Sequence, residues 1–192
     1  MVKYKVYIFR HGQTYFNKNK IFTGWKESKL TSLGIKQAKK IALKLKNKKI
    51  SIAIETKLSR SKDTLKQVLK YHPECKKIII DNRIIERSYG DLEGKYHDFA
   101  IKKYGIEQFN KWHRGFRIRP PKGESFADVE KRVGNFVKDL RKLIKKEKVN
   151  IAISAHGNSI RLFRKIIEKK SEKEAVKWFI PYDSYYEYSF RV

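Results

Sequence analysis

The sequence has almost no cysteine and no long apolar run. Cys75 is the only cysteine among its 192 residues, so no disulfide can form within the chain. The opening residues, MVKYKVYIFRHG, lack the uninterrupted apolar stretch of a secretory signal peptide. No segment approaches the ~20 apolar residues that a membrane-spanning helix needs. These absences predict a cytoplasmic protein with no membrane partner.

Acidic residues are also scarce. The chain has 20 Asp and Glu against 47 Lys and Arg, which gives a formal net charge of +27. Such a charge is typical of nucleic-acid-binding proteins, but the lysines are spread over all of the expected helices rather than gathered in one arm or stripe. We therefore do not expect nucleic acid as a partner, and a basic nucleic-acid-binding module is the least favoured alternative. A basic surface still attracts small anions, including phosphate esters.

No linker, low-complexity tract or internal repeat divides the chain, which predicts one domain over residues 1–192. Short apolar strands alternate with amphipathic helices. The expected strands are 3–9, 51–55, 77–81, 149–154 and 185–192. The expected helices are 31–47, 59–71, one or two over 95–112 with a break at Gly105, a long helix opened by Ser125, 158–169 and 172–179. This order predicts an α/β fold, a three-layer α/β/α single domain whose mainly parallel central sheet is covered on both faces.

Polar side chains follow four of the expected strands. Arg10 and His11 come directly after the first strand, and Arg60 follows the second. Glu86 follows the third strand, and His156 follows the fourth. Because ligand sites in such sheets lie beyond the carboxyl ends of the strands, we expect these side chains to meet at one edge of the sheet.

These residue types together favour phosphoryl transfer. A histidine nitrogen is a good nucleophile near neutral pH, and arginine binds phosphate oxygens through paired donors. A carboxylic acid can protonate the leaving oxygen. Gly12 and Gly157 each follow a histidine and are expected to let backbone amides approach an anion. The helix that opens near Asn158 is expected to point its first amides at the same anion.

The segment RHGQTYFN, residues 10–17, resembles the signature of the histidine phosphatase superfamily, the group that includes bisphosphoglycerate-dependent phosphoglycerate mutase. Four further segments resemble motifs of that family and follow in the family's order. They are FTGWKESKLTSLGIKQA after the nucleophile loop, TKLSRSKDT with Lys57 where proline is usual, ERSYGDLEG around the acid, and SAHGNSIR around the second histidine. Each motif alone is weak evidence, but the complete ordered set is a strong signal of membership.

The resemblance implies a phosphohistidine mechanism. His11 attacks phosphorus, and Glu86, held protonated near the site, gives its proton to the leaving oxygen. Asn17 donates a further hydrogen bond to the phosphoryl group. The residues implied to bind the remaining phosphoryl oxygens are Arg10, Arg60 and His156. No metal is expected, and the sequence shows no close cluster of His, Cys and Asp with metal-ligand spacing.

The identity of the acid stays open at the level of the sequence. Glu93 and Asp91 compete with Glu86 for this role. Glu86 alternatively forms a structural ion pair with Arg87 or Arg83.

Three aromatic or imidazole side chains lie in or near the motifs. Trp25 is expected to pack rather than to bind substrate. Tyr89 belongs either to the core or to the pocket wall. His72 precedes Pro73 and is expected at the surface.

Features of the chain point toward both mutases and phosphatases of the family. The segments that resemble the mutases contain Thr23, Gly24, Tyr89 and Asn158. The mutases have two adjacent arginines where this chain has His113 and Arg114. They also have a lysine where it has His97, with Lys95 as an alternative substitute. The segment GES, residues 123–125, resembles the phosphatases, and the chain stops at Val192 without the tail that closes the mutase site.

An open site exposes a phosphohistidine to water. We therefore expect a metal-independent phosphatase that hydrolyses a small phosphorylated metabolite, with the mutase that interconverts 2- and 3-phosphoglycerate as the alternative. No cofactor is expected, except bisphosphoglycerate as a phosphoryl primer for a mutase. The oligomeric state stays open, with a homodimer as one alternative. The expected substrate-binding residues are Asn17, Thr23, Gly24, Tyr89, Arg114, Gly157 and Asn158.

Overall fold

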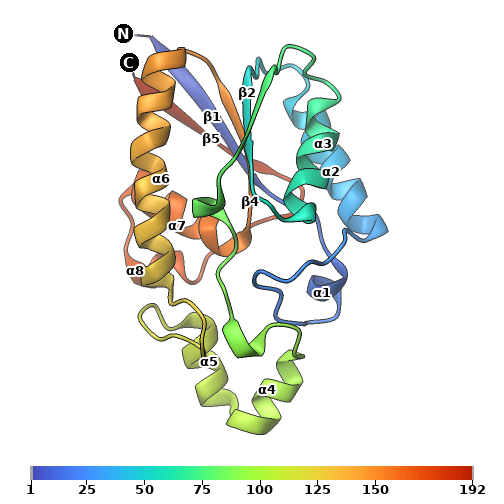
Figure 1. Ribbon diagram of the computed structural model, residues 1–192, viewed down its shortest axis with the longest axis vertical. Helices are drawn as coiled ribbons and strands as arrows, with labels where there is room; N and C mark the ends of the chain where they lie inside the picture. Colours follow the sequence, from blue (N-terminus) through green and yellow to red (C-terminus); the bar gives the residue numbers. More distant parts are fainter. Residues whose placement is uncertain (1, 192) are drawn as a thin grey trace.

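A computed structural model describes residues 2–191 and has a five-stranded sheet at its centre (Figure 1). The strands follow the spatial order β3-β2-β4-β1-β5. β1 pairs with β4 in parallel, and β2 pairs in parallel with both β3 and β4, whereas β5 runs antiparallel to β1. This confirms the mainly parallel sheet. The strands are β1 Lys3–Arg10, β2 Ile52–Glu55, β3 Lys77–Ile80, β4 Ile151–Ala155 and β5 Tyr185–Arg191.

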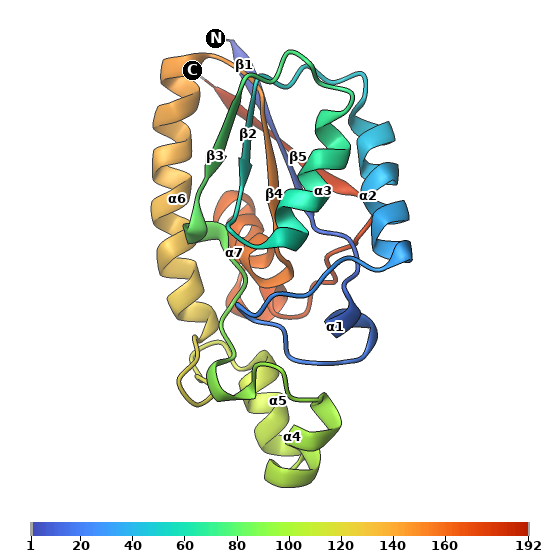
Figure 2. The same cartoon turned by 45° about the vertical axis from the view of Figure 1, so that its right-hand side comes forward.

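Helices cover both faces of the sheet, as expected for parallel strands that are apolar on both sides. Figure 2 shows α6 on one side of the sheet and α2 and α3 on the other. The helix bounds are α2 Ser32–Leu45, α3 Ser59–Leu69, α6 Phe126–Glu147 and α7 Gly157–Glu168. The three-layer α/β/α architecture is therefore confirmed.

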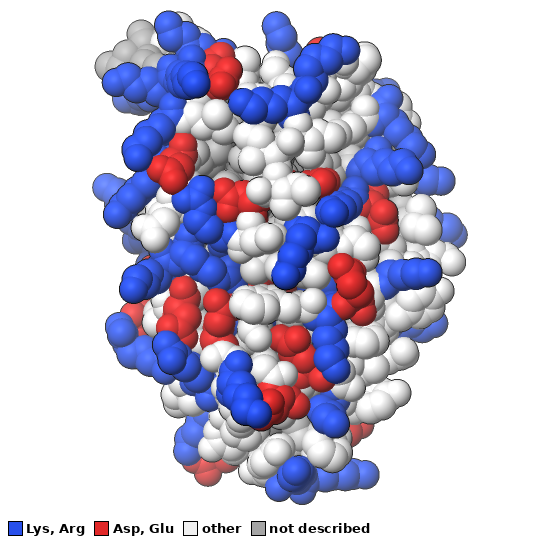
Figure 3. Space-filling view, viewed as in Figure 1, with Lys and Arg blue, Asp and Glu red and all other residues white. Residues whose placement is uncertain are grey.

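The basic side chains are spread over the surface. Figure 3 shows Lys and Arg distributed over the whole visible face, with acidic side chains between them. Some of them form ion pairs that join distant elements, such as Lys165 with Glu130 at 2.5 Å and Lys40 with Asp183 at 2.6 Å. The dispersion of charge matches the expectation from the sequence.

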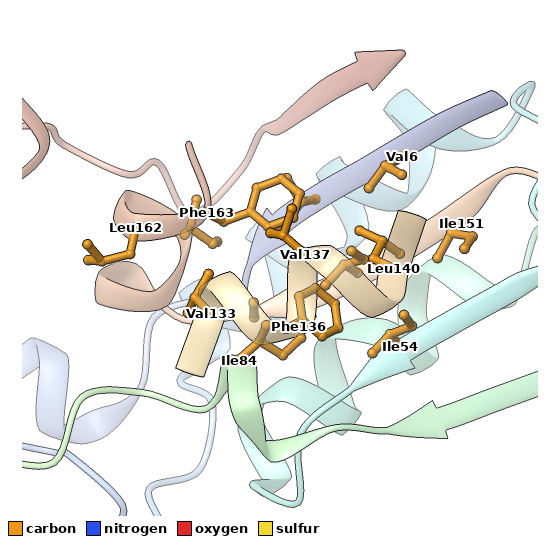
Figure 4. Close-up of a cluster of buried hydrophobic side chains, with 14 of the residues drawn as sticks. Val6, Ile54, Ile84, Val133, Phe136, Val137, Leu140, Ile151, Leu162 and Phe163 are labelled. Carbon is orange, nitrogen blue, oxygen red and sulfur yellow. The ribbon is translucent and has the colours of Figure 1, made fainter. Parts of the chain in front are cut away.

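The larger core lies between the sheet and the α6–α7 layer (Figure 4). α6 begins with a capping box, because Ser125 accepts a hydrogen bond from the Asp128 amide and the Asp128 carboxylate accepts one from the Ser125 amide. The helix then places an apolar stripe on the sheet, in which Val133 and Phe136 are buried. Truncation of Phe136 to alanine is expected to cost about 3–5 kcal/mol of stability, because the surrounding core cannot close the cavity.

A lobe with its own small core lies beyond the carboxyl ends of the strands (Figures 1 and 2). It contains α4, His97–Tyr104, and α5, Ile106–Arg114. Gly105 separates them at φ +81°, a conformation that favours glycine, so the predicted break is confirmed. Short 3-10 turns at Asn82–Ile84 and Gly90–Leu92 lead into this lobe. Its buried side chains are Phe22, Tyr89, Leu92, Ala100, Phe109 and Trp112.

Two short helices differ from the expectation. α1, Tyr15–Lys18, was not expected, and it forms because Thr14 and Asn17 build a capping box around a single turn. The helix expected over 172–179 is shorter, since α8 covers Glu172–Ala175. The helix ends because the Lys177 amide donates to the Glu174 carbonyl three residues back, in a tighter turn, and the Trp178 carbonyl accepts from Arg161 instead of from a helical amide.

The expectation of a surface His72 was wrong. Its side chain is 2% exposed. The chain turns back after α3, where the His72 amide donates to the Leu69 carbonyl and the Cys75 amide donates to the His72 carbonyl. That turn places the ring against the body of the protein, with Nδ1 3.0 Å from Glu74 Oε1. Among residues 2–191, no helix is both long and apolar enough to cross a membrane.

Candidate active site

His11 lies at the carboxyl end of β1, where its amide donates to the Ala155 carbonyl and extends the pairing with β4. The ring is 2% exposed, and Nδ1 lies 2.8 Å from the Gly12 carbonyl oxygen. Because a carbonyl can only accept, Nδ1 carries the proton and the lone pair lies on Nε2. Burial, together with the positive charges of Arg60 and Arg10, holds the His11 pKa well below its usual value. The ring is therefore a neutral imidazole with one free nucleophilic nitrogen.

His156 lies at the carboxyl end of β4 and begins α7. It is fully buried, and its ring centroid lies 5.1 Å from that of His11. Nε2 is 2.8 Å from the Thr56 hydroxyl, whereas Nδ1 has no hydrogen-bond partner among the described residues. Burial and the nearby Arg60 hold the His156 pKa well below its usual value. His156 thus has one nitrogen available for an oxygen of a ligand.

Arg60 is positioned by main-chain carbonyl groups of the loop that follows α1. It is 1% exposed, and its Nη1 and Nη2 donate to the carbonyl oxygens of Lys26 and Gly24 at 2.8 and 2.7 Å. Burial lowers the Arg60 pKa to about 10, which leaves the guanidinium charged at neutral pH. Its Nε is buried without a partner in residues 2–191 and remains available as a donor.

Arg10, the last residue of β1, is held differently. Its Nη1 donates to the Ile180 carbonyl at 3.1 Å, and its guanidinium lies 3.9 Å from the centroid of the Tyr182 ring. A side chain at position 157 would meet the Arg10 guanidinium at 3.3 Å, so Gly157 provides the space for it. The two predicted arginines therefore reach the same site from β1 and α3.

The expectation for Gly12 was wrong. Its amide donates to the Thr64 hydroxyl at 3.1 Å instead of facing an anion. A Cβ at this position would lie 2.2 Å from the Gly34 carbonyl oxygen, and one at position 34 would lie 2.0 Å from the Gln13 carbonyl oxygen. Glycine is required because the nucleophile loop and the start of α2 approach each other backbone to backbone.

Glu86 is the carboxylate that reaches the pocket. Its Oε1 accepts hydrogen bonds from the Arg87 amide at 2.8 Å and the Asn158 amide at 3.2 Å. Its competitors are used elsewhere: Glu93 accepts from the Ser88 hydroxyl and the Tyr89 amide. Asp91 is exposed and faces Lys122, and Arg83 pairs with Asp81 and Asp139. The geometry therefore favours Glu86 as the candidate acid.

These groups surround a pocket of about 280 Å³. Every predicted site residue except His156, whose ring is next to that of His11, contributes to its wall. Tyr89 belongs to both of its proposed environments, since it is 7% exposed and also lines the pocket. The predicted wall residues are Arg10, His11, Asn17, Thr23, Gly24, Arg60, Glu86, Tyr89, Arg114, Gly157 and Asn158.

The predicted site residues omit part of the wall. Arg161 lies one helical turn after Asn158, and its Nη1 donates to the Asn158 Oδ1 at 2.5 Å. This i,i+3 spacing on α7 was a usable signal. Tyr182 comes from the segment before β5, and no local pattern in the sequence indicated it. The other wall residues outside the predicted set are Phe16, Lys20, Ile21, Phe22, His97, His113 and Phe179.

The wall that belongs to the lobe combines cations with neutral imidazoles. Arg114, the last residue of α5, belongs to it, and Lys20 from the loop after α1 and Arg161 from α7 line the pocket nearby. The rings of His97 and His113 lie 5.5 Å apart. Burial, with Arg114 nearby, lowers the His113 pKa to about 3, and burial also lowers the His97 pKa. These two side chains are therefore uncharged at neutral pH.

The pocket has no side-chain set that resembles a metal centre. Within residues 2–191, no group of three or more His, Cys, Asp and Glu side chains is placed to hold a metal ion. Five cations line the pocket, Lys20, Arg10, Arg60, Arg114 and Arg161, against the single carboxylate of Glu86. The arrangement is suited to an anionic ligand that reacts with the His11 imidazole.

A sequence model of the histidine phosphatase superfamily (branch 1) matches residues 6–191. The chain belongs to the histidine phosphatase superfamily. It is 39% identical over 173 residues to a phosphoglycerate mutase of Schizosaccharomyces pombe, covering 88% of this chain and 81% of that protein. It is 37% identical over 174 residues to a 2,3-bisphosphoglycerate-dependent phosphoglycerate mutase of Mesorhizobium japonicum, covering 88% of this chain and 84% of that protein.

Solved structures of this superfamily have the same fold. A mycobacterial glucosyl-3-phosphoglycerate phosphatase superposes with a TM-score of 0.84 at 21% identity, covering 98% of this chain and 91% of the other. A phosphoglycerate mutase from Bacillus anthracis superposes with a TM-score of 0.79 at 20% identity, covering 98% and 88%. As a histidine phosphatase superfamily member, the protein is a phosphoryl-transfer enzyme for a small phosphorylated metabolite, in a family whose enzymes are metal-independent.

Proposed function

We propose that this histidine phosphatase superfamily protein is a bisphosphoglycerate-dependent phosphoglycerate mutase that works through a phosphohistidine at His11. The observation that carries the proposal is the presence of two cationic ends in one pocket. Arg10 and Arg60 lie near the His11 and His156 imidazoles. Lys20 and Arg114 lie near His97, and Arg161 lies between Arg114 and Arg10. All five cations line the pocket. A small molecule with a phosphate at one end and a carboxylate at the other complements both cationic ends. The 37–39% identity to mutases supports the same choice over the phosphatase expected from the sequence.

In the first step, the neutral His11 Nε2 attacks a phosphoryl group of bisphosphoglycerate. A P–N bond forms as the P–O bond to the leaving oxygen breaks. The Nδ1–H hydrogen bond to the Gly12 carbonyl at 2.8 Å holds the ring in the required tautomer. Arg10 and Arg60 stabilise the charge on the phosphoryl oxygens in the transition state, with His156 and Asn17 as further donors.

Glu86 moves the proton. Its Oε1 is held by two amides, so Oε2 is the oxygen suited to carry the proton to the leaving oxygen. The resulting carboxylate then takes the proton from the second hydroxyl of phosphoglycerate, which attacks the phosphohistidine. This transfer breaks the P–N bond, forms bisphosphoglycerate and leaves Glu86 protonated. His11 then attacks the other phosphoryl group while Glu86 protonates the departing oxygen, so the phosphohistidine forms again and the isomeric phosphoglycerate is released.

A second candidate, hydrolysis of a phosphomonoester, is favoured by one observation. The mutases of the family have a lysine at the position of His97 and an arginine at that of His113. Both histidines are uncharged at neutral pH. A neutral wall binds a carboxylate less strongly than a cationic one. A weakly held acceptor gives water more time to attack the phosphohistidine.

Phosphorus NMR of the protein with 3-phosphoglycerate and a trace of bisphosphoglycerate distinguishes the two functions. We expect 2-phosphoglycerate to appear with little inorganic phosphate, and the His11→Ala variant to form neither. Inorganic phosphate as the main product would replace the mutase with a phosphatase. Product formation by His11→Ala would overturn the phosphohistidine mechanism itself.

A further inference from the structure

The segment that carries Glu86 has little regular structure of its own. Between β3 and α4 the chain forms only two short 3-10 turns among the described residues, and Glu86 lies between them. Neither a strand nor a helix therefore fixes the position of its main chain. An acid that must meet one leaving oxygen needs such a fixed position, since a displacement of about 1 Å can cost about 10²-fold in rate.

Trp25 contacts the main chain of Glu86 from the loop after α1. Its indole Nε1 donates to the Glu86 carbonyl oxygen at 2.7 Å. The expectation that Trp25 packs is therefore incomplete: 45% of the residue is exposed, and its polar atom is the part that is used. The same loop presents the Gly24 and Lys26 carbonyls that bind Arg60. One loop thus positions both a phosphate-binding arginine and the acid.

Arg132 contacts the same carbonyl oxygen from α6. Its Nη2 donates to the Glu86 carbonyl at 3.0 Å, and its Nη1 donates to the carbonyls of Ile85 and Arg83 at 2.9 and 2.7 Å. The Glu86 carbonyl therefore accepts two side-chain donors that come from separate elements. Two donors occupy both lone pairs of a carbonyl oxygen, which fixes the peptide plane as well as its position.

Glu124 holds Arg132 in place. Its two carboxylate oxygens each accept from Arg132 at 2.9 Å, in the paired geometry that suits a guanidinium. The same carboxylate accepts from the Ser88 amide at 3.0 Å, and the Glu124 amide donates to the Ser88 carbonyl at 3.0 Å. Only about a fifth of each charged side chain is exposed, at 18% and 19%. Glu124 therefore connects Arg132 to the chain on the other side of Glu86.

We propose that Trp25 and Arg132 are positioning residues that hold the Glu86 peptide from two sides, so that the carboxyl group meets the leaving oxygen. The inference rests on the proposed role of Glu86 as acid. Loss of either donor leaves the phosphate-binding side chains in contact with phosphate but displaces the proton donor. The defect falls on the proton-transfer step alone.

The test compares two phosphate esters in single-turnover phosphorylation of His11. p-Nitrophenyl phosphate has a leaving group that needs no acid, whereas bisphosphoglycerate, or the best aliphatic phosphate ester found, needs one. Trp25→Phe keeps the ring and removes the N–H, and Arg132→Lys keeps the charge and removes the paired donors. Glu86→Gln is the reference for a lost acid. Arg164→Lys, which keeps the charge and removes the paired donors to Glu168 at a position outside the pocket lining, is the matched control.

We expect Trp25→Phe and Arg132→Lys to lower the single-turnover rate constant about tenfold for the aliphatic ester, with the half-saturating ester concentration unchanged and less than about twofold change in rate constant for p-nitrophenyl phosphate. Arg164→Lys is expected to change neither. Equal losses for both esters would overturn the inference, as would full activity of Trp25→Phe and Arg132→Lys alongside a selective defect in Glu86→Gln. A Glu86→Gln enzyme with no selectivity between the esters would instead overturn the proposed acid, and the inference with it.

Discussion

The two ends of the pocket are formed by different parts of the fold. At the phosphate end, His11, His156 and Arg60 are at most 2% exposed and lie just past the carboxyl ends of the parallel strands. At the outer end, His97 and His113 come from a lobe that has its own small core. His11 and Arg60 are held by main-chain carbonyls and His156 by the Thr56 hydroxyl, whereas the His97 and His113 rings pack against each other.

We expect the phosphate end to determine the reaction and the outer end to determine the preference between substrates. The reacting phosphoryl group meets buried side chains whose pKa values are set by burial and by each other's charge. In the function proposed above, the remainder of the substrate lies against the lobe, where neutral imidazoles stand beside Arg114. Changes at the phosphate end should abolish turnover for every substrate, and changes in the lobe should alter the preference between substrates.

The largest expected effect is at the nucleophile. His11→Ala removes the nitrogen that accepts the phosphoryl group, so turnover should fall by at least about 10³-fold for all esters. Activity measured with p-nitrophenyl phosphate checks this, and circular dichroism verifies that the variant is folded. Retained turnover would show that the phosphate end does not act through His11.

A smaller effect is expected at the acid. Glu86→Gln should slow aliphatic phosphate esters by about 10²-fold and aryl phosphates far less, because only poor leaving groups need the proton. The ratio of kcat/KM values for the two ester classes measures it. A uniform loss would mean that Glu86 binds phosphate rather than donates a proton.

The buried histidines should make the fold sensitive to acid. Unfolded histidine titrates near pH ~6.5, whereas the His113 pKa in the folded protein is lowered to about 3. Above pH ~6.5 both states are neutral; below it the unfolded chain binds the proton first, so stability falls as the pH drops toward 3. For His113 this amounts to about 2 kcal/mol at pH 5. Urea unfolding at pH 7 and pH 5 should show a smaller difference in His113→Asn, and an unchanged difference would refute the assignment.

Restoring charge in the lobe should change affinity without changing the chemistry. The double variant His97→Lys with His113→Arg adds two cations to the outer wall and should lower the KM for 3-phosphoglycerate about tenfold, at constant kcat. His97→Gln with His113→Gln is the matched control, because it changes the same positions and adds no charge. If both double variants behaved alike, the carboxylate would not lie against this wall.

The smallest effect is expected from a chelator. Incubation with EDTA should leave kcat and KM unchanged within error, because cationic side chains supply the field that a metal would otherwise provide. Activity that disappears with EDTA and returns with added Mg²⁺ would show that the phosphate end needs an ion.

The phosphate end was predictable from the sequence because its signals are local. Apolar strands end in polar residues, and in a parallel sheet all strand ends meet at one edge, so Arg10, His11, Arg60, Glu86 and His156 could be brought together without coordinates. The boundaries of the strands and of the long helices followed from the same periodicity to within a few residues.

The rest depends on packing between segments that are far apart in the chain. The Trp25 indole reaches Glu86 across 61 positions, and the Glu86 carbonyl also accepts from Arg132, 46 positions away. No periodicity encodes either contact. His72 was misplaced for the same reason, since its burial depends on a turn after α3 rather than on its immediate neighbours. The Arg10 guanidinium stacks on the face of the Tyr182 ring, a contact between segments far apart in the chain that no sequence pattern indicates.

The interlocked glycines of the nucleophile loop have a consequence for the motion of the enzyme. Gly12 and Gly34 leave no room for even a methyl group between the loop and the start of α2. Any sliding of α2 along the sheet must therefore shift the loop that carries His11. The rate of turnover therefore depends on the position of α2. On warming, we expect turnover to decline at a lower temperature than the cooperative unfolding of the sheet.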